Sequence, residues 1–106
     1  FQGHGRVALG WMRKAADLAG MRVVTEALSE TDVGAVAEHA DMVQVGSRNM
    51  HNYALLKAVG ATKRPVLLKR GMAATVEEWL LAFVAAALAA LTQYLLARGS
   101  SAVVFC

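Results

Sequence analysis

Four polar side chains lie at the ends of short apolar segments that have the length and composition of β-strands. They are Glu26, Gln44, Arg48 and Lys69, and Ser47 precedes the arginine. Arginine offers a planar fork of donors and lysine a point charge, so the pair suits a phosphate or a carboxylate. We therefore predict an anion-binding site that uses Arg48 and Lys69. The alternative, which the pattern favours equally, is that both cations pair with Glu26 or are only solvated.

These polar residues belong to a series of four strand-length apolar segments. The segments are Met21–Ala27, Met42–Gly46, Pro65–Lys69 and Ala102–Cys106. Alternate residues of a strand face the same side of a sheet, which places Gln44 and Arg48 on the face opposite Val43. The same alternation puts Glu26 and Lys69 on that polar face. The carboxyl ends of parallel strands would then bring the polar side chains together.

Helical patterns separate the strands. They cover Arg6–Ala19, Asp32–His39 and Met50–Val59, and a fourth helix follows Thr75. Gly20 suits the left-handed residue that ends a helix, and Ser29 or Thr31 can cap the second helix. Thr75 and Glu78 form a capping box at the start of the fourth helix. Alternating helices and strands with short connections imply a parallel sheet with right-handed crossovers.

The predicted fold class is α/β, with four parallel strands alternating with helices in a single domain over residues 1–106. A (β/α)8 barrel needs about 250 residues, so this chain forms at most roughly half of one. The chain opens on Phe1 without an initiator methionine and closes on an apolar run. We interpret it as a fragment of a longer barrel.

The fourth helix contains a long uncharged stretch, Trp79–Ala97. The stretch reaches transmembrane length, but its many alanines, together with Thr92 and Gln93, make it a weak membrane span. A helix that is apolar on all sides is more often buried on more than one face, here by the sheet and by another chain. We favour this interpretation over a membrane span.

Composition excludes several classes of protein. Of the 106 residues, 57% are hydrophobic and 18% are charged, which excludes intrinsic disorder. The net charge of +3 is spread along the chain, so we predict no binding of nucleic acid. The single cysteine, Cys106, excludes an intramolecular disulfide and fits a reducing, cytoplasmic location.

No motif indicates a catalytic or metal centre. His4, His39 and His51 lie in different segments, without a partner at the spacing of metal ligands. The glycines near the N-terminus form no GxGxxG pattern, and no pairing of a nucleophile with a base is present. We therefore assign no catalytic residue and no metal ligand, and we expect the histidines to lie on the surface or in loops.

Five strings occur in an order and at a spacing typical of one enzyme family. They are FQGHG, the AAD of residues 15–17, GMRVVTEAL, ADMVQVGSRNMHNYALLK and PVLLKRGMAATVEEWLL. Together they closely resemble the middle of 3-deoxy-D-arabino-heptulosonate 7-phosphate (DAHP) synthase, of the type related to KDO-8-phosphate synthase. The resemblance covers nearly all of residues 1–81 and resumes at residues 94–106.

The resemblance implies an internal half of a (β/α)8 barrel that condenses phosphoenolpyruvate with erythrose 4-phosphate at the entry to the shikimate pathway. In the family, the arginine of a Gly-Ala-Arg string binds the phosphate of phosphoenolpyruvate. This role carries over to Arg48, with Ser47 in place of the alanine. The lysine of the Leu-Leu-Lys-Arg-Gly string contacts the same substrate and carries over to Lys69. Gln44 and Glu26 complete the substrate-binding set that we predict.

The resemblance also implies what this chain lacks. The family uses a divalent metal, whose cysteine, histidine, glutamate and aspartate ligands fall outside the chain, and Cys106 does not match the ligand cysteine. The Lys-Pro-Arg-Thr-Ser string that holds both substrates is also outside. We therefore expect no cofactor in this chain, weak binding of phosphate or phosphoenolpyruvate, and no catalysis by the chain alone.

One internal departure from the family pattern is an insertion over Phe83–Gln93, which lengthens the fourth helix by about nine residues, or roughly 13 Å. The long helix and two open strand edges favour a homodimer, formed through the edges or by packing two long helices together. The alternative to a fragment of an enzyme is thus an engineered or selected half-barrel that folds and self-assembles without catalysis.

Overall fold

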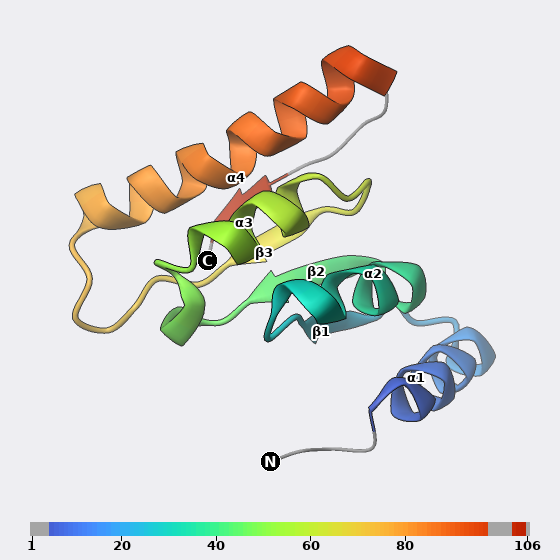
Figure 1. Ribbon diagram of the computed structural model, residues 1–106. Coiled ribbons are helices and arrows are strands. Elements are labelled where there is room, and N and C mark those ends of the chain that lie inside the picture. Colours follow the sequence, from blue (N-terminus) through green and yellow to red (C-terminus); the bar gives the residue numbers. More distant parts are fainter. Residues whose placement is uncertain (1–4, 98–102, 106) are drawn as a thin grey trace.

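The computed structural model (Figure 1) describes residues 5–97 and 103–105. Helices and strands alternate along the chain, as the sequence predicts. The elements are α1 Arg6–Ala19, β1 Val24–Glu26, α2 Glu30–His39, β2 Met42–Val45, the 3-10 helix η1 Ser47–Asn49, α3 Tyr53–Gly60, β3 Val66–Leu68, α4 Val76–Ala97 and β4 Val103–Phe105.

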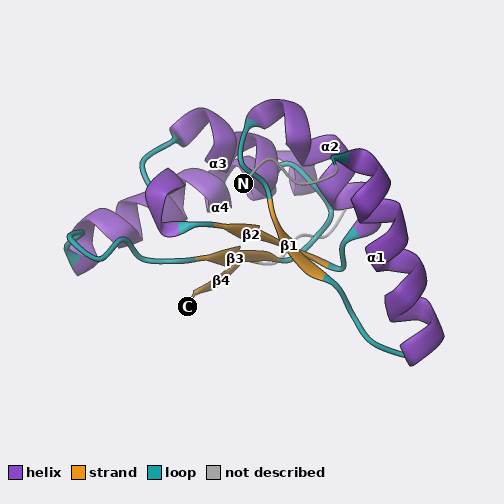
Figure 2. Ribbon diagram, turned by 90° about the horizontal axis from the view of Figure 1, so that it is seen from below, coloured by secondary structure: helices purple, strands orange, loops and turns teal. Residues whose placement is uncertain are grey.

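The strands form one sheet in the order β1-β2-β3-β4, and every neighbouring pair is parallel. Glu26 pairs in register with Gln44, which pairs in turn with Leu67. Helices α2, α3 and α4 lie on the same side of the sheet, and α1 lies beside the β1 edge (Figure 2). The predicted α/β class with parallel strands is confirmed.

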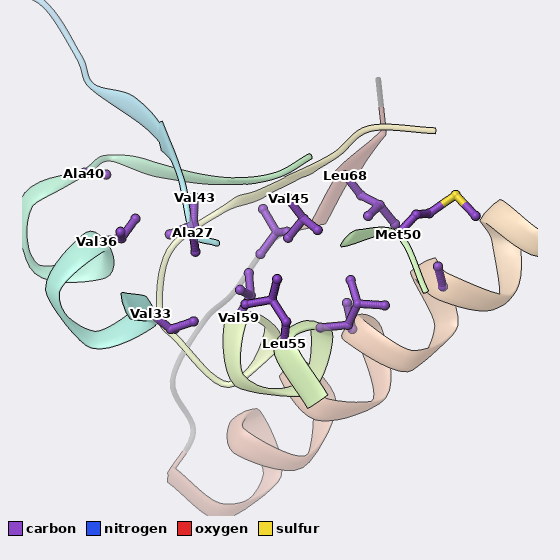
Figure 3. Close-up of a cluster of buried hydrophobic side chains, with 14 of the residues drawn as sticks. Ala27, Val33, Val36, Ala40, Val43, Val45, Met50, Leu55, Val59 and Leu68 are labelled. Carbon is purple, nitrogen blue, oxygen red and sulfur yellow. The ribbon is translucent and has the colours of Figure 1, made fainter. Parts of the chain in front are cut away.

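The hydrophobic core lies between the sheet and its helices. Val43 and Val45 of β2 and Leu68 of β3 have no exposed surface. Val43 and Val45 lie on the side of the sheet that faces α3, where Leu55 and Val59 are also fully buried, and the Leu68 side chain lies next to Met50 (Figure 3). The apolar face expected from the alternation of β2 and β3 is therefore the face that the helices cover.

Helix α4 packs against α3 through small residues. Ala82 and Ala86 have no exposed surface. A Cβ atom at Gly60, the last residue of α3, would lie 2.2 Å from the backbone oxygen of Ala86, so only glycine allows this approach. Leu88 and Leu91 are 57% and 52% exposed in this chain, so burial of a second face of α4 by another chain stays a prediction.

No helix within the described ranges combines the length and hydropathy that a membrane crossing needs.

The strands are shorter than predicted, and one helix starts later. Strand β1 begins at Val24 rather than Met21, and of the last predicted strand Ala102 and Cys106 lie outside the described residues. Helix α3 begins at Tyr53, because the side-chain oxygen of Asn52 caps it by accepting from the backbone amide of Leu55 at 3.2 Å. The predicted start at Met50 is therefore wrong.

Of the three helix ends for which the sequence predicts a cap, two have the predicted capping interaction. Gly20 ends α1 with a φ of 68°, as predicted. The Thr75 hydroxyl accepts from the Glu78 amide at 3.1 Å, and the Glu78 carboxylate accepts from the Thr75 amide at 3.1 Å, so the capping box is present. Ser29 is the N-cap residue of α2, but its hydroxyl bonds the side chains of Thr31 and Asp32 instead of the backbone.

A charged cluster fixes α1 beside the sheet. The Arg13 guanidinium donates to the carboxylates of Asp17 at 2.6 Å and Asp41 at 2.8 Å. Asp41 also accepts from the Val23 amide at 2.8 Å, immediately before β1. The Arg13 guanidinium, and after it the Val23 amide, hold the pKa of Asp41 below its ordinary value.

We expect Asp41→Asn to lower the free energy of unfolding at pH 7. A carboxyl group with a depressed pKa stabilises the fold above its ordinary pKa, and this contribution disappears as the pH falls through the lower folded value. Urea titrations should therefore show a gap between wild type and variant at neutral pH that closes below the ordinary value of 3.8. Glu38→Gln, on the exposed side of α2, is the control. A gap that persists unchanged at acid pH would contradict this expectation.

Candidate anion-binding site

The carboxyl ends of β1, β2 and β3 meet at one edge of the sheet because the strands are parallel. Glu26 ends β1, whereas Arg48 and Lys69 follow β2 and β3. The amide of Lys69 donates to the carbonyl of Val45 at 3.1 Å, which keeps the loop after β3 beside the end of β2. The structure thus gathers the residues predicted from sequence at one end of the sheet.

Glu26 and Gln44 form the ordered polar pair of this site. The Gln44 side-chain amide donates to the Glu26 carboxylate at 3.3 Å, and both side chains are half-buried. A Cβ atom at Gly46 would lie 2.5 Å from Oε1 of Glu26, so the glycine leaves the space that the carboxylate occupies. An ionised carboxylate only accepts hydrogen bonds. Glu26 can therefore accept a hydrogen bond from a hydroxyl group or bind a cation, but it cannot bind an anion.

The sequence predicts that the alternation of β2 extends to Arg48, and this extension is wrong. Strand β2 ends at Val45, and the next residues form η1, in which the Asn49 amide donates to the Gly46 carbonyl at 2.9 Å. Successive side chains of a 3-10 helix turn by about 120° rather than 180°. The two-residue period of β2 therefore does not reach Arg48, whose position depends on the turn.

Both cations of the site are exposed to solvent. Within the described part of the chain, Arg48 and Lys69 make no ion pair, and Glu26 is bonded to Gln44 instead. Ser47, just before the arginine, is half-buried. Pairing of the cations with Glu26 is not observed, and the exposed side chains are compatible both with solvation alone and with an anion site. Their guanidinium and ammonium groups are free to approach an anion from solvent.

One contact joins the segments that carry the two cations, and a second joins the segment after η1 to α4. The amide of Gly71 donates to the sulfur of Met50 at 3.4 Å, beneath the loop after β3. The His51 ring lies 3.2 Å from the Glu78 carboxylate at the start of α4. Hydrogen bonds from Thr75, with a smaller effect of His51, hold the pKa of Glu78 below its ordinary value. The predicted loop position of His51 is confirmed, but its partner is distant in sequence and was not predicted.

The metal that the resemblance implies does not fit the residues present. Across residues 5–97 and 103–105, no three histidine, cysteine, aspartate or glutamate side chains gather closely enough to hold an ion. His39 bonds the carbonyl of Ala35 at 2.8 Å, while His4 and Cys106 lie outside the described residues. What the site offers is cationic and hydrogen-bonding chemistry.

Comparison with known proteins places this arrangement in a family. The sequence profile of the DAHP synthetase I family matches residues 1–102. The chain belongs to the DAHP synthetase I family. Phospho-2-dehydro-3-deoxyheptonate aldolase from Thermotoga maritima is 44% identical over all 106 residues, and the chain spans 29% of the length of that relative. The family resemblance found in the sequence is confirmed.

Two solved structures agree with this assignment to the DAHP synthetase I family. A crystal structure of the Thermotoga maritima DAHP synthase superposes on the whole chain with a TM-score of 0.86 and 44% identity, and the match covers 29% of that structure. A truncated form of the Thermotoga maritima enzyme matches 99% of the chain with a TM-score of 0.84 and 43% identity, covering 36% of its own length. Both the fold and the sequence thus match a segment of a larger enzyme.

Proposed function

We propose that this chain is the internal half of a DAHP synthase barrel and supplies the binding site for the phosphate of phosphoenolpyruvate. The observation that carries the proposal is the pair Arg48 and Lys69, two exposed cations that follow adjacent parallel strands at the same end of the sheet. Ligands of β/α barrels bind at this end of the strands. We propose phosphoenolpyruvate as the anion because the chain belongs to the DAHP synthetase I family.

In the proposed site, each residue has a distinct role. Arg48 donates two parallel hydrogen bonds to two phosphate oxygens. Lys69 adds a positive charge on a flexible side chain that can reach the same anion. Ser47 and Gln44 can donate further hydrogen bonds. Glu26 repels an anion, so its contact with a substrate must be to a hydroxyl, or it orients Gln44 through their 3.3 Å hydrogen bond.

The proposed barrel needs four more strands than this chain provides. Strand β1 pairs only with β2 and β4 only with β3 among the described residues, so each has an open edge. The total accessible surface is 6833 Å². A compact protein of this mass exposes roughly 5,700 Å², so about 1,100 Å² of extra surface is open. We propose that the rest of a longer chain covers it, since the relative is far longer than this chain.

Titration calorimetry with phosphoenolpyruvate tests the proposed site. A charge-assisted hydrogen bond contributes about 1.5 to 3 kcal/mol, so Arg48→Ala should weaken binding roughly 10- to 150-fold. Lys69→Ala should also weaken it, because the second charge is lost. The matched control is Arg22→Ala, which removes an exposed arginine before β1, at the opposite end of the sheet. Equal affinities for Arg48→Ala and Arg22→Ala would refute the assignment.

Without the rest of the barrel, we expect the purified chain to produce no DAHP from phosphoenolpyruvate and erythrose 4-phosphate, with or without added manganese. The reason is that neither the ligands for the family's metal nor the string that holds both substrates is in this sequence. A discontinuous assay for the product, run beside an intact DAHP synthase, measures this. Turnover that depends on manganese would show that the chain assembles a complete site.

A further inference from the structure

An ion pair joins the segment after η1 to the first turn of α4. His51 follows η1, the turn that carries Arg48, and Glu78 belongs to the helix that follows the loop of Lys69. Nε2 of the His51 ring lies 3.2 Å from Oε2 of Glu78. The other ion pairs of the described residues both involve Arg13 of α1. The pair is thus the ionic contact at the end of the sheet where the proposed anion site lies.

The Glu78 carboxylate uses its two oxygens for two different contacts. Oε1 accepts from the amide and the hydroxyl of Thr75, at 3.1 and 3.0 Å, and completes the capping box of α4. Oε2 is the atom that faces His51. Because the cap already fixes the carboxylate, Glu78 loses little rotamer entropy when it pairs with the ring. The lowered pKa of Glu78 keeps this carboxylate charged at every pH at which an imidazole titrates.

The start of α4 is attached to the strand that precedes Lys69. The indole Nε1 of Trp79 donates to the carbonyl of Leu68, the last residue of β3, at 3.4 Å. Glu78 precedes this tryptophan directly, and Lys69 follows the leucine directly. The position of the Glu78 carboxylate is therefore fixed relative to the loop that carries Lys69.

That loop also lies against the segment that carries Arg48. The Gly71 amide donates to the sulfur of Met50 at 3.4 Å. A Cβ atom at Gly71 would lie 3.5 Å from the carbonyl oxygen of Ser47, which is an ordinary contact distance. Both of these contacts are weak, since one has a sulfur acceptor and the other is only van der Waals. The ion pair is the one charged interaction that holds the two segments together among the described residues.

The strength of this ion pair depends on the charge of one ring. Imidazole is the side chain whose charge changes between about pH 5 and 8. The other titratable groups of the segments that meet here are Arg48 of η1, Tyr53 and Lys57 of α3, Lys69 and Arg70 of the loop after β3, and Glu77 of α4. Side chains of these types change charge outside this pH range. The cations among them oppose protonation of His51 and Glu77 favours it, but Glu78 alone lies within ion-pair distance of the ring.

We propose that His51 is a positioning residue of the anion site: its protonated ring, paired with Glu78, holds the segment of Arg48 against the loop of Lys69. This role rests on the proposed function of the site and adds a dependence on pH to it. When the ring loses its proton the attraction disappears, so the two cations are less often placed to bind one anion. The pair is exposed, and exposed ion pairs contribute little, so we expect affinity to rise only about two- to fivefold on acidification.

Calorimetric titration with sulfate tests the effect on affinity. Sulfate is the probe because its charge is constant over this range, whereas a phosphate monoester titrates near about pH 6. Wild type should bind sulfate about two- to fivefold more tightly at pH 5.5 than at pH 8, and His51→Gln should bind it equally at both. The matched control is His39→Gln, at the opposite end of the sheet, which should keep the wild-type ratio. An unchanged ratio in His51→Gln overturns the proposal.

Glu78→Gln separates positioning from a direct effect of the charged ring on the anion. Glutamine also completes a capping box, so α4 keeps its cap while the negative charge facing His51 is lost. The affinity should then no longer depend on pH. A variant that keeps the full wild-type ratio would show that the ring acts on the anion directly, and the positioning role would be overturned.

Amide exchange without ligand tests the ion pair separately from the proposed function. The Gly71 amide, which bonds Met50 across the two segments, should exchange about two- to fivefold faster in His51→Gln than in wild type at pH 5.5, and equally fast at pH 8. Equal exchange at pH 5.5 overturns the proposal whether or not sulfate binds. Equal sulfate affinities for wild type and Arg48→Ala would instead refute the proposed function, while faster exchange in His51→Gln would still support the role of the ion pair in joining the segments.

Discussion

Gly60→Ala should lower the free energy of unfolding by about 3 kcal/mol, at the upper end of the cost of overpacking. Alanine has the higher helix propensity, so the local preference of α3 favours the substitution by up to about 1 kcal/mol. The new Cβ, however, would lie 2.2 Å from the backbone oxygen of Ala86. That oxygen belongs to the middle of α4 and cannot move unless the two helices separate. The steric term therefore wins.

Gly46→Ala is the matched control for this prediction. Its Cβ would also meet an oxygen, at 2.5 Å, but that oxygen is the end of the flexible Glu26 side chain. The carboxylate can rotate away, at the cost of its contact with Gln44, so we expect a loss within about 1 kcal/mol. Urea unfolding followed by circular dichroism compares the two variants. Gly60→Ala with wild-type stability would contradict the packing of α3 on α4.

Leu55→Ala should destabilise the fold by about 2 to 5 kcal/mol. The side chain has no exposed surface and lies in the centre of the core, facing Val45 and beside Val59 (Figure 3). Truncation removes apolar contacts and leaves a cavity, which the sheet and helices cannot close by moving together. Domains of this size are stable by only about 5 to 15 kcal/mol, so we expect the variant to lose much of its folded population at 37 °C.

A surface leucine provides the comparison for Leu55. Leu18 of α1 is 88% exposed, and Leu18→Ala should change the free energy of unfolding by no more than about 0.5 kcal/mol. Both variants are measured by urea unfolding at a concentration low enough to exclude association. A small loss for Leu55→Ala would mean that the helix layer does not pack on β2 as described.

The proposed site and the packed core are linked through the loops. Met50, which is 1% exposed, lies beneath the loop after β3 and accepts the hydrogen bond from Gly71. Arg48 belongs to the turn just before this anchor, and Lys69 to the loop that it supports. The side chains of the two cations are exposed to solvent, while the backbone next to them is held by contacts with the core. This arrangement suits the binding of an anion whose remaining contacts come from elsewhere.

The sequence by itself determined the order of the elements, the apolar face of the sheet and the family. The buried residues Val43, Val45, Val66 and Leu68 alternate with the half-buried Gln44 and Leu67, and this period follows from the geometry of a strand alone. Gly20 and the Thr75–Glu78 box marked helix ends because capping uses only neighbouring residues. The family strings were recognisable because each is contiguous in sequence.

Only the tertiary structure decided the contacts between distant segments. The fold brings together groups that are far apart in sequence. Examples are the pairing of His51 with Glu78 and the hydrogen bond from Arg13 to Asp41, and the turn that carries Arg48 likewise depends on its surroundings. The same is true of α4. Its composition predicted burial by the sheet and by another chain, and the fold shows which side is covered here: Ala82 and Ala86 are buried, whereas Leu88 and Leu91 are exposed. Periodicity reports which residues share a face, whereas the packed neighbours determine which face is covered.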